Sequence, residues 1–402
     1  MTIISLFGVL LGLLAIPLFL KPKTFSRLAL AIFVIMVHVA VTQVYYFYTL
    51  TNRADAYAYY FAGSYWDSLP WTALSTGFVG HATQFLRNTF QATYEDCFMI
   101  FQASGAWGLM ILMRTFEEIR AKTMSPPTPL EDYVLFLPSL HFWTCAIGKD
   151  GPMFLAVGLA VWSALNLSRR VIPLIIALGI MVLFRAHIAL AVALSLAVAA
   201  LLHSQFSAGR KAILFVIGLV GTGILLVAVG STFHLDVTDP SSYADLIDKH
   251  EMMENGDRGT SSIKDAPYIV RMLSVLFRPL FFDIHDSLGL IASVENVGSV
   301  LLFCFLLLHM KDTLFMAKRV LFIKFLVVFS LVMIAMLTFI TYNIGLGLRE
   351  RTMAIGPVLC LFFAVRAFDR LRRGAQPLPA MRGARPVSAR PAAAAPDQLP
   401  AG

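Results

Sequence analysis

The sequence predicts an all-α polytopic membrane protein, a transmembrane helical bundle. Of its 402 residues 58% are apolar and only 14% are charged, whereas soluble domains carry about 25% charged residues. Many apolar runs approach or exceed the roughly 20 residues that cross a hydrocarbon core. The formal net charge of +8 lies mostly in the connections between these runs, so it indicates topology and not nucleic-acid binding.

The first half of the chain begins with an apolar run at residues 3–20, followed by Lys21, Lys23 and Arg27. No basic stretch precedes this run and no small-residue cleavage site follows it, so we expect an uncleaved span. The positive flank places the N-terminus outside and the next loop in the cytoplasm. Further elements are expected as a second span at 28–50, a long external loop at about 51–96 and a third span at 97–113.

The rest of the chain continues the alternation of spans and loops. Four short spans are expected at 133–147, 152–167, 171–184 and 186–202, and an eighth at 212–233. A second external loop at about 234–286 precedes spans at 287–309, 320–341 and 352–369. The sequence thus predicts about eleven spans in a membrane domain over residues 1–370. A disordered cytoplasmic tail is expected over 371–402, because it is rich in Pro, Ala and Arg and has no apolar periodicity.

The charge distribution supports this topology. The loops and tail expected in the cytoplasm carry 19 of the 32 Lys and Arg residues. The external loop at 234–286 has ten acidic residues against five basic ones. Because positive residues favour the cytoplasmic side, the N-terminus is predicted outside and the C-terminus inside.

Two polar interruptions stand out in the middle of the chain, Lys149-Asp150 and Arg185-Ala186-His187. The spans around them are about 14–17 residues long, shorter than a hydrocarbon core requires. Their turns can therefore lie below the outer surface and form the floor of an external cavity. The alternative is a surface turn at Lys149-Asp150 and a snorkelling flank at Arg185.

The second external loop ends in an amphipathic pattern at 267–278. Its apolar residues have helical spacing and predict a helix in the outer interface; they are Ile269, Met272, Leu273, Leu276 and Phe277. Arg278 falls on the other face, and Asp283, His285 and the intramembrane carboxylate Glu295 follow. The alternative for Asp283 and His285 is a capped turn before the ninth span. An Asp-His-Asp metal cluster is the weaker interpretation.

Two other external stretches have the composition of binding sites. Arg349 and Arg351 follow glycines in the last external turn, and paired guanidinium groups suit phosphate. A solvated Arg-Glu-Arg turn is the alternative. In the first loop, Asp55 precedes Tyr59 and Tyr60, as in sites where aromatic faces cover sugar rings. An interfacial aromatic belt would explain the tyrosines but not the aspartate.

Four segments together resemble a known family. An Asp-Ala-x-x-Tyr-Tyr segment follows the second span, and LPSLHFWTCAIGKDG, FRAHIAL and FRPLFFDIHDSLGLIASVEN come later. From about residue 50 to 355 the chain resembles bacterial exopolysaccharide and O-antigen polymerases, within the membrane glycosyltransferases that use lipid-linked donors. FRAHIAL departs from the pattern, with Ala186 where a proline is expected after the arginine.

The resemblance implies glycan transfer on the outer face of the bacterial inner membrane. The donor would be an oligosaccharide on undecaprenyl diphosphate, the acceptor another lipid-linked chain, and neither metal nor cofactor would be required. The implied diphosphate ligands are Lys149, Arg185, Arg278, Arg349 and Arg351. The implied base is His187 or Asp55, with His285 and Asp283 as second choices. Tyr59, Tyr60, Asp150 and Glu295 would contact the glycan.

Other functions share these features. A transporter or flippase for a lipid-linked glycan also needs external cations and broken helices. A ligase that transfers finished glycan has the same donor, and a glycan O-acyltransferase would need a His near the cytoplasm. Besides membrane lipid, a chain-length regulator or other polysaccharide assembly proteins are the expected partners.

Overall fold

The computed structural model describes residues 2–52, 54–203, 266–284, 286–341 and 344–374, and the single positions 207, 209, 221, 223 and 263. Every regular element in this part of the chain is a helix, which confirms the predicted all-α class. The expected eighth span, most of the second external loop, His285 and the tail beyond 374 lie outside the described residues.

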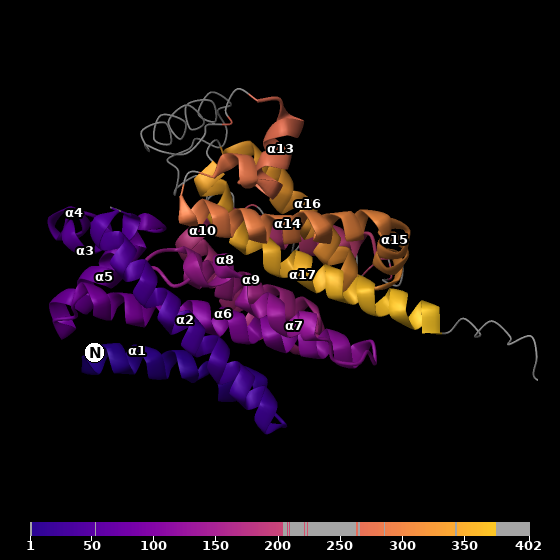
Figure 1. Ribbon diagram of the computed structural model, residues 1–402, viewed down its shortest axis with the longest axis horizontal. Helices are drawn as coiled ribbons and strands as arrows, with labels where there is room; N and C mark the ends of the chain where they lie inside the picture. Colours follow the sequence, from indigo (N-terminus) through magenta and orange to yellow (C-terminus); the bar gives the residue numbers. More distant parts are fainter. Residues whose placement is uncertain are drawn as a thin grey trace, which may run out of the picture.

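Seven of the described helical segments are long and apolar enough to cross a membrane. They are Ile3–Leu20 (α1, Ile3–Leu13, and a π-helical turn, η1, Ile16–Leu20), α2 (Phe25–Thr51), α6 (Tyr94–Lys122), α10 (Val171–Leu201), α14 (Ser287–Leu308), α16 (Leu321–Ile340) and α17 (Ile344–Gly374). They lie side by side along the long axis of the molecule (Figure 1). The count of eleven spans is therefore not confirmed.

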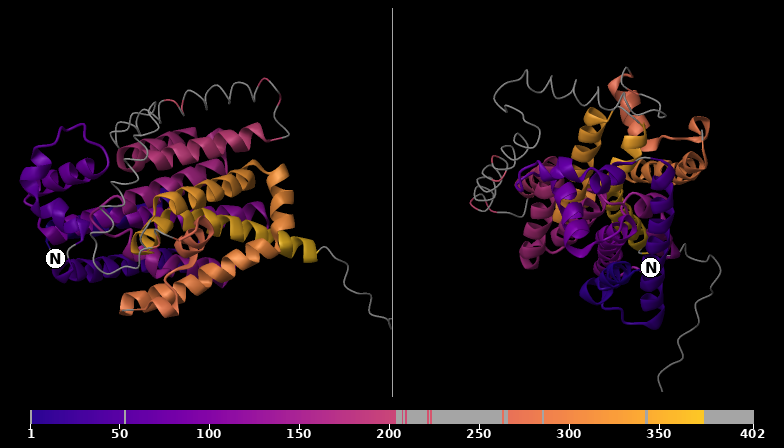
Figure 2. Two further views of the ribbon diagram at one scale, coloured as in Figure 1. Left: turned by 90° about the horizontal axis from the view of Figure 1, so that it is seen from above. Right: turned by 90° about the vertical axis from the view of Figure 1, so that its left-hand side faces the viewer.

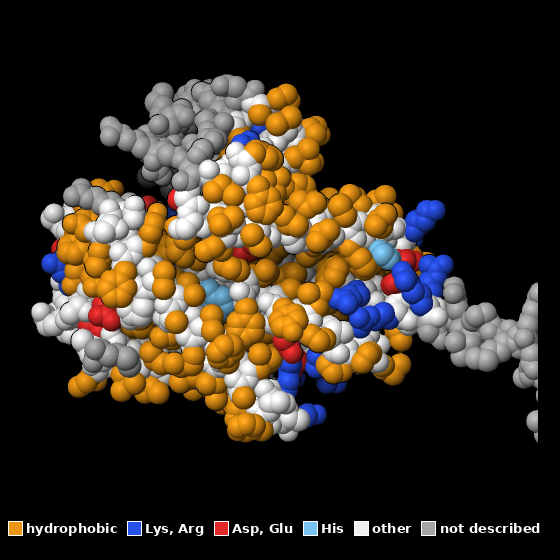
Figure 3. All heavy atoms as spheres, viewed as in Figure 1, with side chains coloured by type: hydrophobic (Ala, Val, Ile, Leu, Met, Phe, Trp, Pro, Cys, Tyr) orange, Lys and Arg blue, Asp and Glu red, His pale blue; other side chains and the backbone are white. Residues whose placement is uncertain are grey.

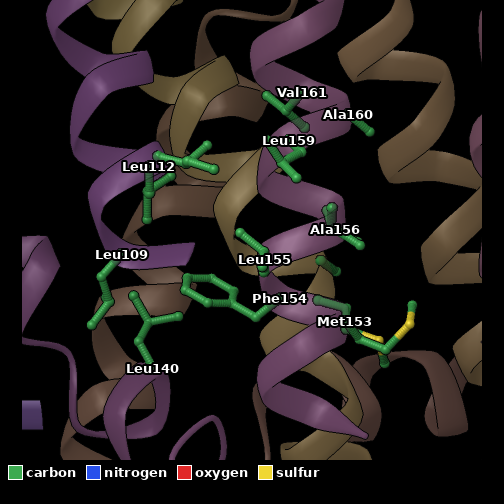
Figure 4. Packing of buried hydrophobic residues seen from close by; sticks show 14 of the residues in the cluster. Leu109, Leu112, Leu140, Met153, Phe154, Leu155, Ala156, Leu159, Ala160 and Val161 are labelled. Carbon is green, nitrogen blue, oxygen red and sulfur yellow. The ribbon is translucent and has the colours of Figure 1, made fainter. Parts of the chain in front are cut away.

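The core forms around α9, Asp150–Ala164. Nearly every residue of this helix is buried, because α6, α10 and α17 pack around it. Phe154 and Leu155 lie close to Leu109 and Leu112 of α6 (Figure 4). A Cβ atom at Gly108 would lie 2.4 Å from the Phe154 ring, so only glycine allows this close approach. The central helix is thus held by apolar packing on all sides.

The bundle has two different ends. The α3 end carries α3 (Asp55–Phe61), α4 (Gly63–Asp67) and α5 (Thr76–Phe90), and there α6, α9 and α17 begin. The expected loop at 51–96 is thus largely helical. The described N-terminus also lies at this end, and α17 finishes at the opposite end (Figures 1 and 2).

The opposite end, here called the basic end, is where α6, α9 and α17 finish. Lys and Arg side chains gather there (Figure 3). Its ion pairs join Arg27 to Glu117 and Asp132, Arg120 to Glu131, Arg170 to Glu118, and Arg372 to Asp312 at the start of α15 (Met310–Arg319). The charge asymmetry expected from the sequence is therefore a spatial asymmetry among the described residues.

Helix α10 contains two of the expected spans. It is kinked at Arg185, whose φ of −151° and ψ of 80° are not helical. Arg170, just before α10, donates to Glu118 at the basic end, and Leu202, just after it, accepts from Lys324 at the start of α16. Arg185 itself contacts the first residue of α9 at the α3 end. The chain therefore reverses at the kink, and the two expected spans are the two arms of one element.

The expected span at 133–147 is not one continuous helix. It consists of α7 (Pro129–Tyr133), a 3₁₀ turn (η2, Val134–Phe136) and α8 (Pro138–Phe142). Because α6 ends and α9 begins at opposite ends of the bundle, this segment crosses the bundle in short pieces. Pro138 lacks the amide hydrogen that would continue the preceding turn. Leu135, Leu140 and His141 anchor this broken segment in the core, whereas Tyr133 and Pro138 are exposed.

Two elements near the C-terminus bear on the predictions. The amphipathic helix is confirmed as α13, Tyr268–Phe277, with Ser274, Val275 and Leu276 buried and Ile269 and Leu273 exposed. The expected external turn before the last span is instead helical, because α17 already begins at Ile344. Arg349, Glu350 and Arg351 therefore project from different faces of one helix.

Candidate functional site

A buried ion-pair network lies at the α3 end, centred on Asp150, the first residue of α9. Arg185 at the kink of α10 donates from Nη2 to Asp150 Oδ1 at 2.8 Å. Arg349 of α17 donates from Nε to Asp150 Oδ2 at 2.5 Å. Only 4% of the Asp150 side chain is exposed. One carboxylate thus joins three elements that are far apart in the sequence.

Two further carboxylates, Asp55 and Glu350, join this network. The five side chains together are here called the Asp150 cluster: Asp55, Asp150, Arg185, Arg349 and Glu350. Arg185 Nη1 donates to Glu350 Oε1 at 2.9 Å, and Arg349 Nη1 donates to Asp55 Oδ2 at 2.7 Å. The Glu350 Oε2 atom is buried and has no hydrogen-bond partner among the described residues. Side-chain exposure is 59% for Asp55 and 12% for Glu350. Asp55 is therefore the outer member of the cluster.

Lys149 lies beside this cluster and is bound differently. Its Nζ donates to Thr76 Oγ1 at 3.2 Å and, at 3.5 Å, to Ser75 Oγ. Burial, and then the charges of Arg185 and Arg349, lower the pKa of Lys149 to about 8. With Lys149 included, three cations face three carboxylates, so the region is formally neutral around neutral pH.

Ser75 helps to place Lys149 and the kink together. Its φ of 58° is in the left-handed region, which is costly for a residue with a side chain. Its backbone N–H donates to Leu183 O at 2.7 Å, just before Arg185. Phe78 of α5 also packs edge-on against Phe184. The α5 layer is thereby joined to the kink that presents Arg185.

Arg351 belongs to a separate group. It lies two residues after Arg349, about 200° around α17, and so faces α13 and α14 instead of α9. Its guanidinium donates to Leu276 O at the end of α13 and to Asn296 Oδ1 of α14. Asn296 Nδ2 in turn donates to Pro279 O at 2.6 Å. The structure thus gives Arg351 a role in holding α13, outside the Asp150 cluster.

Arg278 and Asp283 pair with each other. Arg278 Nε donates to Asp283 Oδ2 at 3.0 Å, and this contact raises the pKa of Arg278. Asp283 also accepts from the Leu280 N–H, and Asp286 caps α14 through the Gly289 N–H at 2.7 Å. These contacts fit the capped-turn alternative. The expected gathering of Arg278 with Lys149 and Arg185 is therefore not observed.

Two of the four residues expected to contact glycan, Glu295 and Tyr60, instead hold neighbouring helices and loops together. Glu295 accepts from the backbone N–H of Ser139 at 2.9 Å and from its hydroxyl, which ties α14 to α8. Tyr60 donates from its hydroxyl to Ala92 O at 3.0 Å, and Arg87 lies 4.9 Å from its ring centroid. Neither side chain lies in the Asp150 cluster.

Tyr59 lies closer to the cluster but is almost fully buried. Its ring packs against Trp66, with centroids 5.4 Å apart. Burial and then the charge of Asp55 raise its pKa above the ordinary value. Tyr59 therefore forms the wall behind Asp55 and offers little surface to a sugar.

The candidate bases occupy different positions. Asp55 is hydrogen-bonded within the cluster, whereas His187 is half-buried two residues beyond the kink. Asp283 lies with Arg278, and His285 is outside the described residues. His38 and His141 are buried and contact each other, Nδ1 to Nδ1 at 3.2 Å.

Sequence reasoning missed Glu350, the second carboxylate on Arg185. The only signal was its position between Arg349 and Arg351, which fits a solvated turn equally well. It also missed Thr76 and Ser75, which lie in an ordinary stretch of the first loop. In the part of the chain that the structure describes, no three His, Cys, Asp or Glu side chains are grouped to hold a metal ion.

No protein-family model matches the chain, and neither a curated protein nor a solved structure is significantly similar to it.

Proposed function

We propose that the protein is a polymerase-type glycosyltransferase of surface or exopolysaccharide synthesis. It would transfer an oligosaccharide from undecaprenyl diphosphate to a lipid-linked acceptor at the α3 end. One observation carries the proposal: Lys149, Arg185 and Arg349 come from distant segments and converge at the end opposite the basic end. Charged side chains are costly within the membrane-spanning part of a protein, and where they converge they mark candidate substrate sites.

The chemistry gives these cations a use. The acceptor hydroxyl oxygen attacks the anomeric carbon of the donor sugar, the bond from that carbon to the diphosphate oxygen breaks, and lipid diphosphate leaves. The hydroxyl proton passes to a base, for which Asp55 and His187 are the candidates. Negative charge develops on the leaving diphosphate, and cations already fixed in place stabilise it. Asp150 fixes Arg185 and Arg349 for this purpose.

The two ends of the bundle support an orientation. Positive residues favour the cytoplasmic side of a membrane, and they gather at the basic end. The α3 end then faces outward, where lipid-linked glycans are available after translocation. In a bacterium this is the outer face of the inner membrane.

A transporter of lipid-linked glycan is the second candidate. The broken crossing at residues 129–149 favours it, because discontinuous helices often form the substrate sites of transporters. Purified protein supplied with a synthetic diphosphate-linked oligosaccharide and analysed for product size separates the functions. A ladder of products is expected. A single addition would indicate a ligase, and no reaction with intact donor would reject enzymatic transfer.

A further inference from the structure

The two aspartates that bind Arg349 differ in how firmly they are held. Asp150 is enclosed and binds Arg185 as well as Arg349. Asp55 is more than half exposed and accepts, within the described residues, only from Arg349 Nη1. An exposed ion pair contributes little to stability, whereas breaking a buried one is costly. If a ligand competes for Arg349, Asp55 is the group that leaves.

Arg349 keeps its position when Asp55 leaves. Its Nε remains bonded to Asp150, and its side chain is only 20% exposed. The freed Nη1 then points to the position that a carboxylate oxygen occupied. Phosphate oxygens accept hydrogen bonds from guanidinium with similar geometry and carry more charge. The position of the Asp55 carboxylate is therefore suited to one oxygen of a phosphate or diphosphate.

The attachment of Asp55 allows such an exchange. Asp55 is the first residue of α3, and α3 packs against α4 and α5. Its departure from Arg349 needs only a side-chain rotation at the start of a short helix. The packing of α9 with α6 and α10 is not involved.

We propose that Asp55 is an exchangeable internal anion, which occupies the phosphate position on Arg349 until a diphosphate displaces it. This inference rests on the proposed function for its catalytic consequence. The displaced carboxylate lies beside the bound diphosphate and accepts the proton of the acceptor hydroxyl as that oxygen bonds to the anomeric carbon. The electron pair of the broken bond leaves with the lipid diphosphate. Asp55 is thus available as a base only when the donor is bound.

The test uses full-length protein in lipid nanodiscs and inorganic pyrophosphate as the probe. Asp55→Asn removes the competing charge, so pyrophosphate should bind at least about tenfold tighter than to the wild type. Asp67→Asn is the matched control, because Asp67 is an exposed aspartate of α4 at the same end and lies outside the cluster. It should change the affinity less than about twofold. Adding Arg349→Gln to Asp55→Asn should abolish the gain.

Three results overturn the exchange: equal or weaker binding by Asp55→Asn, the same gain from Asp67→Asn, or no binding of pyrophosphate to either protein. Product sizing with the lipid-linked donor separates this inference from the proposed function. If Asp55→Asn binds pyrophosphate tenfold tighter but the wild type forms no glycan product, the exchange is supported and the glycosyltransferase function is rejected. If the wild type makes glycan polymer but Asp55→Asn shows no gain in pyrophosphate affinity, only the exchange is rejected.

Discussion

At the scale of single residues, the Asp150 carboxylate fixes the positions of the two guanidinium groups of the site. Its two oxygens hold Arg185 and Arg349, and all three side chains are largely buried. Removing one partner of such a buried pair costs about 3–5 kcal/mol, because a charge is left without compensation. Asp150 is therefore better suited to positioning the two cations than to contacting sugar.

Lys149 should make anion binding depend on pH. Its pKa of about 8 means that it is charged below this pH and neutral above it. The affinity for pyrophosphate should therefore fall by up to about tenfold between pH 7 and 9, since the ammonium is lost. In Lys149→Arg the guanidinium stays charged, so the affinity should fall less. Isothermal titration calorimetry measures the affinity of both proteins at each pH. Because pyrophosphate changes its own protonation equally in both experiments, the difference between the two proteins reports on Lys149. Equal pH profiles would show that Lys149 does not contact the anion.

Some of these residues were predictable because burying a charge is expensive. Lys149, Asp150 and Arg185 interrupt apolar runs, and the sequence already indicated a shared position for them. The directions in which Arg349 and Arg351 project from α17 were not predictable in the same way. Arg349 and Arg351 flank one glutamate symmetrically in the sequence, and only packing sends one toward α9 and the other toward α13.

At the scale of elements, the kink in α10 is what brings Arg185 to Asp150. A continuous straight helix of 31 residues would place one arm outside the bundle, yet Ile188, Val192 and Ala199 of the second arm are fully buried. The residue at the kink has backbone angles closer to extended than to helical values. A residue before proline likewise avoids helical angles, and the φ of −151° at Arg185 lies within its usual range of about −120 ± 40°.

Proline should therefore be tolerated directly after the kink. Ala186→Pro places the ring at the first residue of the second arm, where an amide hydrogen has no helical partner. Ala191→Pro, in the interior of the same arm, removes a helical hydrogen bond and costs about 3 kcal/mol or more. Melting of the purified proteins followed by circular dichroism should show a markedly lower Tm only for Ala191→Pro. Similar Tm losses in both variants would mean that the helix continues through Arg185.

Two apolar spans near the C-terminus, α14 and α16, were predictable to within a few residues. A long, uniformly apolar run satisfies its backbone hydrogen bonds in a bilayer as one continuous helix. The crossing at 129–149 was not. Its short apolar pieces together have the length of a single span, and the break before α8 falls at Pro138.

At the scale of the whole molecule, the described charged groups differ between the two ends of the bundle. Arginine ion pairs gather at the basic end, which the proposed orientation places on the cytoplasmic side. The α3 end instead combines a layer of short helices, α3–α5, with the buried Arg185 and the partly exposed Lys149 and Arg349. Under the proposed function, a donor lipid would reach these cations from the membrane and an acceptor would reach them from outside.

The release of lipid diphosphate from a synthetic donor in the presence of acceptor tests the central claim most directly. Arg349→Gln should lower kcat/KM by about 100-fold or more, because a fixed cation at the leaving group is lost. Arg319→Gln is the matched control, since Arg319 is an exposed arginine at the end of α15 that stacks on Phe315. It should leave the rate within about twofold of the wild type. A wild type that releases lipid diphosphate, with Arg349→Gln within about threefold of its rate, would contradict a catalytic role for the Asp150 cluster.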